Sequence, residues 1–286
     1  MKRPGRGLIG YMPRDEAIAT LQGGTLVAGA TPPPTLVDTW QRAKQAAESR
    51  SPVKISNPIV EAPPELKSIL EAAQRRQDLI ATLSPHKWRL AAIDISKPLL
   101  SYQRVIVVDD AVERVSKGNP DDPATLLDIC LPEGQTIQME GGFDPIQNAF
   151  TTSSLNPNLR VAGFAAVDTA GPAASTNKVF GFALSFGSSF VQLVEYRNRW
   201  MIRDGYHRIY GLLKRGIRLI PGVVIEARSF EETGAARPGF FNYELLYGDR
   251  PPLIGDFLDD QLSAEIPIPA VRKVIRIRAE EFAIPV

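Results

Sequence analysis

The densest group of chemically capable side chains in this sequence is Asp204-Gly205-Tyr206-His207-Arg208. An aspartate, a histidine and an arginine within five residues could bind an anion or move a proton. The imidazole ring titrates near neutral pH, and a guanidinium can hold phosphate oxygens in a bidentate contact. We therefore take residues 204–208, which include one of the chain's two histidines, as the first candidate site.

The residues around this group predict a turn from a sheet into a helix. Residues 190–202 read as two strands joined by a tight turn. Apolar residues recur at helical spacing over 209–213, and Gly216 is placed to end that helix in the left-handed conformation. Residues 217–225, interrupted by Pro221, are expected to return as an edge or bulged strand of the same sheet. The candidate group would then lie at a helix N-terminus, where free N–H groups favour anions.

This order of strand, Gly-x-x-Arg elbow, helix, glycine and strand resembles the nucleotide-binding core of the ParB and sulfiredoxin superfamily. Residues 204–208 (DGYHR) are similar to the Gly-Cys-His-Arg of sulfiredoxins and the Asp-Gly-His-His-Arg of free serine kinases. A weaker first box lies in residues 90–108, where Gln103-Arg104 is nearest to the Gln-Pro-Arg segment that opens the ParB core. Tyr206 stands where sulfiredoxins have their cysteine, and the glutamate of the ParB elbow is missing, so the chain is a divergent relative at best.

The resemblance implies a bound nucleoside triphosphate, ATP or CTP, accompanied by Mg²⁺. Gly205, Tyr206, His207 and Arg208 would hold the phosphates through helix N–H groups and the guanidinium. His207, assisted by Asp204, would be the catalytic residue if phosphate is hydrolysed or transferred. A first-turn arginine that awaits a ligand is expected to make few contacts within the fold.

Two other interpretations stay open. The elbow could be ordinary local structure, with Asp204 as a helix N-cap, and the protein a non-catalytic scaffold or interaction protein that keeps a ParB-like fold. The elbow segment is also rich in basic and aromatic residues, which could form a nucleic-acid surface, so DNA is a further candidate partner. Those residues are Tyr196, Arg197, Arg199, Trp200, Arg203, Tyr206, Tyr210, Lys214, Arg215 and Arg218.

The composition of the chain argues against several classes of protein and of binding site. The 286 residues include 33 Lys and Arg against 32 Asp and Glu, so the chain has no global nucleic-acid signature. One cysteine, Cys130, cannot form an internal disulfide, and one cysteine with two histidines argues against an ordinary zinc site. We see no run of ~20 apolar residues that could span a bilayer. We expect a cytoplasmic protein without a membrane partner.

Proline content divides the chain into three zones. Residues 1–64 are expected to form a proline-rich arm or linker with one helix over 36–49, available to a protein partner. Residues 65–228 would be the ParB-like core, interrupted by a β-rich insertion at about 120–188. Residues 229–286 would be a C-terminal β-rich extension.

Periodicity adds individual elements to these zones. An amphipathic helix is predicted over 65–83, and strands over 126–131 and 136–139. The runs 159–167 and 179–186 read as a long hairpin, and 274–278 as a final strand. The expected fold class is α/β (α+β).

Overall fold

The chain forms a mixed α/β structure made of two compact units. The computed structural model describes residues 2–24, 31–116, 118–133, 140–154, 159–169, 177–186 and 189–285. Unit 1 comprises Met1–Glu133 and Ser189–Ala270, and unit 2 comprises Gly134–Ser188 and Val271–Val286. The insertion therefore begins later than the predicted position near residue 120. The predicted C-terminal extension is divided between the two units.

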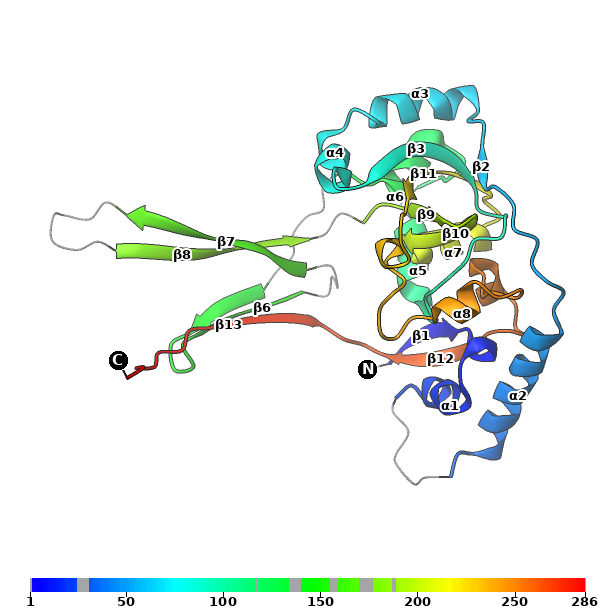
Figure 1. Ribbon diagram of the computed structural model, residues 1–286, viewed down its shortest axis with the longest axis horizontal. Helices are drawn as coiled ribbons and strands as arrows, with labels where there is room; N and C mark the ends of the chain where they lie inside the picture. The colour runs from blue at the N-terminus through cyan, green and yellow to red at the C-terminus, as the bar shows by residue number, and fades with distance from the viewer. Residues whose placement is uncertain are drawn as a thin grey trace. The chain divides into compact units, whose positions relative to one another are not determined.

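The elbow belongs to a five-stranded sheet at the centre of unit 1. The order is β10-β9-β11-β3-β2, with β11 parallel to β9 and antiparallel to β3 (Figure 1). Helix α7 connects β10 to β11, which confirms the predicted strand, helix and strand in one sheet. The bounds are β2 Ile59–Val60, β3 Lys87–Asp94, β9 Gln192–Tyr196, β10 Arg199–Asp204, α7 Tyr206–Lys214 and β11 Leu219–Glu226.

Strand β11 lies inside this sheet, and the expectation of an edge strand was wrong. Proline has no N–H to donate, so it is normally confined to edges. Pro221 pairs with Ala92 of β3, but the pairing of β11 with β9 starts at Val223. Pro221 therefore lies in the part of β11 that pairs with β3 alone. The apolar residues from Val223 onwards pair with β3 on one side and β9 on the other.

Four further helices belong to this part of unit 1. They are α3 Pro64–Ala73, α4 Gln77–Leu83, α5 Val108–Val115 and α6 Pro123–Cys130. Helix α6 contacts β11, α3 contacts β3 and α6, and α5 packs against α7. The helix predicted over 65–83 is broken at Arg76, whose backbone is extended with a ψ of 127°. At the break, the side chain of Gln74 accepts the N–H of Leu90, and that of Arg76 donates to the carbonyl of Leu131.

Residues 126–131 were predicted as a strand and instead lie mostly within α6. The carboxylate of Asp122 accepts the N–H of Thr125 at 2.8 Å, and Pro123 occupies the first helical turn. These start signals outweigh a short apolar run that fits either structure. Cys130 ends the helix and is fully buried, and burial raises the pKa of its thiol to about 12.

The N-terminal residues pack into unit 1 and do not form the expected arm. A second sheet has the order β12-β1-β4, so strands from opposite ends of the chain lie side by side (Figure 1). Pro4 pairs with Pro267 at a point where β1 has β12 alone as its neighbour. The bounds are β1 Lys2–Gly7, η1 Ile9–Tyr11, α1 Arg14–Gln22, α2 Pro34–Ser49, β4 Val105–Val107 and β12 Ala264–Pro269.

A buried polar cluster fastens this N-terminal segment. Arg50 forms an ion pair of 2.7 Å with Asp256, and the hydroxyl of Tyr11 donates to the same carboxylate at 2.7 Å. Because Asp256 lies in η3, residues up to 50 are tied to the region near 256. The short helices of that region are η2 Glu231–Thr233, α8 Tyr243–Leu246 and η3 Ile254–Leu258. The predicted helix over 36–49 is confirmed as α2.

Unit 2 consists of β-strands in its described parts. One sheet has the order β13-β6-β5, and β7 and β8 form a separate two-stranded ribbon. This confirms the predicted long hairpin and the final strand, while the strand predicted over 136–139 lies outside the described residues. The bounds are β5 Glu140–Asp144, β6 Ala149–Ser154, β7 Leu159–Thr169, β8 Asn177–Phe186 and β13 Lys273–Arg278. No helix in the described ranges is long and apolar enough to cross a membrane.

Candidate functional site

The elbow between β10 and α7 requires a glycine. Gly205 has a φ of 86°, in the left-handed region that costs other residues about 1–2 kcal/mol. A Cβ added at this position would lie 2.8 Å from Cγ2 and 2.9 Å from Cα of Val191. The tight turn predicted from the sequence is therefore present, and it is packed directly against the strand entry at Val191.

On the helix side of the elbow, which we define as Tyr206–Arg208, the arginine is bound inside the protein. Arg208 is 3% exposed. Its guanidinium donates to the carbonyls of Ile129 and Cys130 at 3.1 and 3.3 Å and to the hydroxyl of Ser189 at 2.7 Å. Arg208 thus closes the C-terminus of α6, contrary to the expectation of few contacts within the fold.

His207 is also engaged by the fold. Its Nε2 accepts the backbone N–H of Val107 at 3.1 Å, which requires an unprotonated nitrogen. Burial, with a contribution from the nearby Arg114, lowers the pKa of His207 to about 4. Tyr206 stacks on the histidine ring with centroids 4.4 Å apart, and burial raises the pKa of its phenol to about 12. His207 is therefore a neutral hydrogen-bond acceptor at neutral pH.

Asp204 is the counterion of this region. Its carboxylate accepts the N–H of Gly205 at 2.7 Å. Burial raises the pKa of Asp204, and the positive charges of Arg208, Arg114 and Arg203 oppose that rise. These charges act on Asp204 without an ion pair among the described residues, so its role within the elbow is electrostatic.

On the strand side of the elbow lies an arginine without a carboxylate partner. Arg203 occupies a register irregularity of β10 between Ile202 and Asp204, and such bulges re-aim a side chain. Its Nη1 donates to Oε1 of Gln192 at 2.8 Å, and its Nη2 lies 3.2 Å from Nε2 of His86. In the part of the chain that the structure describes, Arg203 forms no ion pair.

A second cation lies near this arginine. Burial lowers the pKa of Arg203, and the positive charge of Arg237 lowers it further. Burial and the charge of Arg203 also lower the pKa of His86, so that ring is neutral at pH 7. We define the strand side as Arg203, Arg237, His86 and Gln192. Two acidic residues also act on this group, Asp204 on Arg203 and Glu232 on His86, but neither forms an ion pair with Arg203 in the described ranges.

The weaker first box of the resemblance runs beside the elbow. The N–H of Leu100 donates to the carbonyl of Trp200 at 2.8 Å, and that of Ile202 donates to the carbonyl of Leu100 at 3.0 Å. The hydroxyl of Tyr102 donates to the carbonyl of Arg203 at 2.6 Å. Arg104, the arginine of that box, forms an ion pair with Glu16 and donates to the carbonyl of Phe240.

Several basic residues of the proposed nucleic-acid surface are held by internal bonds. Arg197 donates to the hydroxyl of Tyr243 at 2.9 Å. Arg199 donates to the carbonyl of Gly248 at 3.1 Å, and Arg215 to that of Val115. These contacts leave fewer free guanidiniums for DNA than the sequence suggests.

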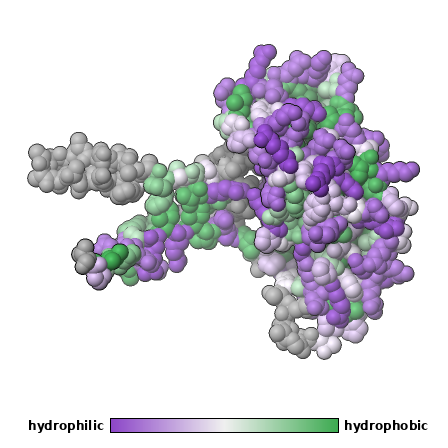
Figure 2. All heavy atoms as spheres, viewed as in Figure 1, coloured by the Kyte–Doolittle hydropathy of each residue, from purple (hydrophilic) through white to green (hydrophobic). Residues whose placement is uncertain are grey.

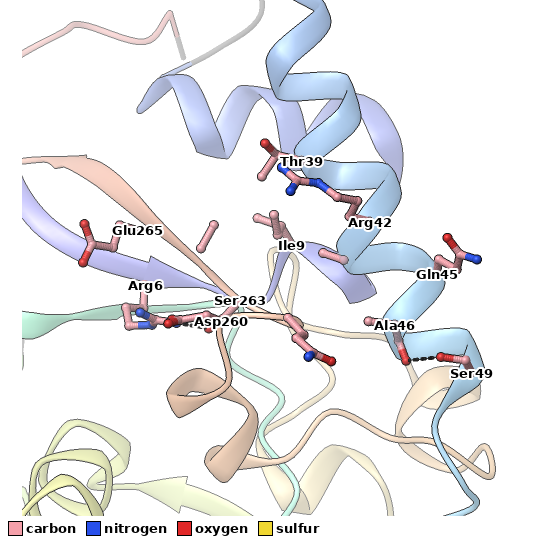
Figure 3. A pocket seen from close by; sticks show the side chains of 13 residues that line it. Arg6, Ile9, Thr39, Arg42, Gln45, Ala46, Ser49, Asp260, Ser263 and Glu265 are labelled. Atoms are coloured by element: carbon pink, nitrogen blue, oxygen red, sulfur yellow. Dashed lines mark hydrogen bonds and ion pairs between the residues drawn. The ribbon is translucent and has the colours of Figure 1, made fainter.

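A cavity of about 730 Å³ lies away from the elbow, between α2 and the ends of β1 and β12 (Figure 3). Its walls carry two basic side chains, Arg6 and Arg42, and two acidic ones, Asp260 and Glu265. Arg6 is paired with Asp260 at 2.6 Å. Because its charges balance, the cavity offers a phosphate no electrostatic preference, and the strand side is the better anion site.

Sequence reasoning missed His86. No local pattern links His86 to Arg203, which lies 117 positions further along the chain. Gln192 was likewise read as an ordinary strand residue. Within the described residues, no group of three or more His, Cys, Asp or Glu side chains is arranged to hold a metal ion.

Comparisons with protein-family models, with curated proteins and with solved structures give no match to this chain. The ParB-like interpretation therefore stays a hypothesis that rests on the residues of the elbow and the first box.

Proposed function

We propose that this protein binds a nucleoside triphosphate on a ParB-like core, with the phosphates held on the strand side of the elbow. The observation that carries the proposal is Arg203, a half-buried cation held by Gln192 and His86 without a carboxylate of its own. Burying a charge is costly unless it is paired. A bound phosphate would supply the missing negative charge.

The neighbours of Arg203 suit the same ligand. Arg237 adds a second guanidinium within electrostatic range. His86 is neutral in the unliganded protein, and the negative charge of a phosphate would raise its pKa and favour the protonated ring. Two guanidiniums and an imidazole that can become charged form a site for several phosphate oxygens.

The residues of the elbow first identified in the sequence, 204–208, would position this site without contacting the ligand. Gly205 forms the turn, while Arg208, His207 and Asp204 fix α7 against α6, β4 and β10. ATP or CTP with Mg²⁺ remains the proposed ligand, the metal being carried by the phosphates. A catalytic role for His207 would require it to release the N–H of Val107, so we propose binding without assigning a general base.

A second candidate function is a non-catalytic scaffold, with a protein or DNA as partner. The specific observation in its favour is that Arg208 and His207 are both bound within the fold. If the strand side also serves structure alone, the ParB-like core would present other surfaces and would need no nucleotide.

Thermal shift separates the two candidates. The wild type is titrated with ATP, CTP, GTP and inorganic triphosphate, each with and without Mg²⁺, beside the variants Arg203→Gln and Arg237→Gln. Arg218→Gln is the matched control, because Arg218 is an exposed arginine that carries the same charge. Binding stabilises by RT ln(1 + [L]/Kd), about 2.7 kcal/mol at a hundredfold excess over Kd.

The nucleotide proposal expects a shift in the wild type and in Arg218→Gln that is lost in the two strand-side variants. A shift with triphosphate equal to that with every nucleotide would limit the site to a polyphosphate. No shift with any ligand in the wild type would refute nucleotide binding and favour the scaffold.

A further inference from the structure

Unit 2 exposes its large apolar side chains to a degree that unit 1 does not. Among the described residues, ten such side chains are exposed in unit 2 and four in the much longer unit 1. Hydrophobic residues of unit 2 are visible at the surface in Figure 2. The ten are Phe143, Ile146, Phe150, Val161, Phe164, Phe182, Val271, Val274, Phe282 and Ile284. Exposed apolar side chains in this number are typical of an interaction site.

The β7–β8 ribbon places aromatic residues opposite each other. Phe164 pairs with Phe182, and Val161 pairs with Leu184. The bulge between Val161 and Gly163 keeps Val161 and Phe164 on one face, because their partners are two residues apart on β8. Phe164 is 76% exposed and Phe182 49%. A two-stranded ribbon is marginally stable in water, so this face needs a partner.

The three-stranded sheet of unit 2 has one apolar face as well. Phe143, Phe150 and Ile277 form a row across β5, β6 and β13, since Phe150 pairs with both of its neighbours in that row. Ile275 belongs to the next row of the same face, opposite Thr152. Phe143 is 61% exposed.

The exposed phenylalanines supply much of the area that a stable dimer needs. The exposed fractions of the four phenylalanines on the two apolar faces are equivalent to about two whole side chains. At about 200 Å² for each phenylalanine, this is roughly 450 Å² per copy. A standard interface buries about 800 Å² per partner, so these phenylalanines alone supply more than half of that area.

The charge of unit 2 favours a protein partner over a nucleic acid. Acidic and basic residues nearly balance, whereas a nucleic-acid surface is strongly basic. In the described ranges the acidic residues are Glu140, Asp144, Asp168, Glu280 and Glu281, and the basic ones are Arg160, Lys178, Arg272, Lys273, Arg276 and Arg278.

We propose that unit 2 is a homodimerisation module, in which the apolar faces of two copies cover each other. A second copy brings an identical ribbon, and a two-fold axis places the same apolar face of both ribbons in contact. Packing face to face covers Phe164 and Phe182 of each ribbon, which is marginally stable on its own. This inference is independent of nucleotide binding by unit 1.

Sedimentation equilibrium of the full chain tests the proposal from low to high micromolar concentration. The variants are Phe164→Arg on the ribbon and Phe143→Arg on the sheet, each combined with a circular-dichroism melt that reports whether unit 1 stays folded. Val112→Arg is the matched control, because Val112 is an exposed apolar residue of unit 1.

We expect the wild type and Val112→Arg to have the mass of a dimer, and the unit 2 variants to raise the dimer Kd at least tenfold. A wild-type mass of one chain at every concentration overturns the proposal, whatever other partner is then found. Dimerisation of both unit 2 variants with the wild-type Kd overturns it as well, and that outcome does not depend on how the variants fold.

Discussion

The helix side and the strand side of the elbow use arginine in different ways. Arg208 is enclosed by two carbonyls and a hydroxyl, so its bonding is satisfied largely by the fold. Arg203 is held by an amide and an imidazole, and its charge has no carboxylate partner among the described residues. Two arginines five positions apart thus differ in how much hydrogen-bonding capacity and charge remain available to a ligand. The position of an arginine in a sequence motif does not show which of the two is available.

The largest expected change in stability is at Arg208, on the helix side. Arg208→Ala should lower the free energy of unfolding by about 3–5 kcal/mol, because it leaves three buried acceptors without their donor. Urea denaturation measures this difference. The exposed Arg218→Ala is the control and should change it by less than about 0.5 kcal/mol. A loss below about 1 kcal/mol at Arg208 would mean that the helix side is not structural.

The next largest effect concerns the elbow glycine. Gly205→Ala should cost about 2–3 kcal/mol, because a left-handed backbone is combined with a clash against Val191. Gly216 has a similar φ of 81° but open space around its Cβ position, so Gly216→Ala should cost about 1 kcal/mol. Thermal and urea unfolding compare the two variants. Equal costs would show that the packing against Val191 is loose.

A third test uses pH. The pKa of His207 is about 4 in the folded protein and about 6.5 when unfolded, so the unfolded chain binds more protons between these values. The contribution of His207 to stability is therefore present above pH 6.5 and is lost as the pH falls to 4, by about 2 kcal/mol for this partly exposed ring. The raised pKa of Asp204 acts in the opposite direction.

For that reason the measurement is the difference between the wild type and His207→Gln across this pH range. Glutamine can accept the N–H of Val107 but does not titrate. A difference that stays constant from pH 7 to 4 would show that His207 is not held in its neutral form.

The smallest expected change in stability is at Arg203, on the strand side. Arg203→Gln should change the unliganded free energy of unfolding by about 1 kcal/mol or less, because the lost bond to Gln192 is offset by relief from Arg237. Urea unfolding without nucleotide measures it. A cost as large as that of Arg208→Ala would show that both arginines serve the fold.

Much of the elbow could be predicted from the sequence because its signals are local. The strand alternation, the turn, the helical spacing and the two left-handed glycines all lie between residues 190 and 226. Helix α2 and the β7–β8 ribbon were found for the same reason. Each is specified by periodicity within the element and by the residues that end it.

The rest depended on distant contacts. The N-terminal prolines suggested an arm, because sequence alone does not show that Pro4 meets one neighbouring strand and so fits a sheet. Helix α6 was misread because a short apolar run fits a strand or a buried helix. The partners of Arg208 and Arg203 come from residues 130 and 86, so which guanidinium is satisfied could not be predicted.

The pairing of β1 with β12 sets the order in which this chain can fold. Lys2 lies opposite Pro269, so β1 can pair with β12 only after all the residues between them have been synthesised. Contacts of such long sequence separation carry a high loop-closure entropy and form late. Until then β1 can pair with β4, but its other edge remains open to aggregation or to a chaperone. A chain that stops short of residue 264 would lack the β12 strand that covers this edge.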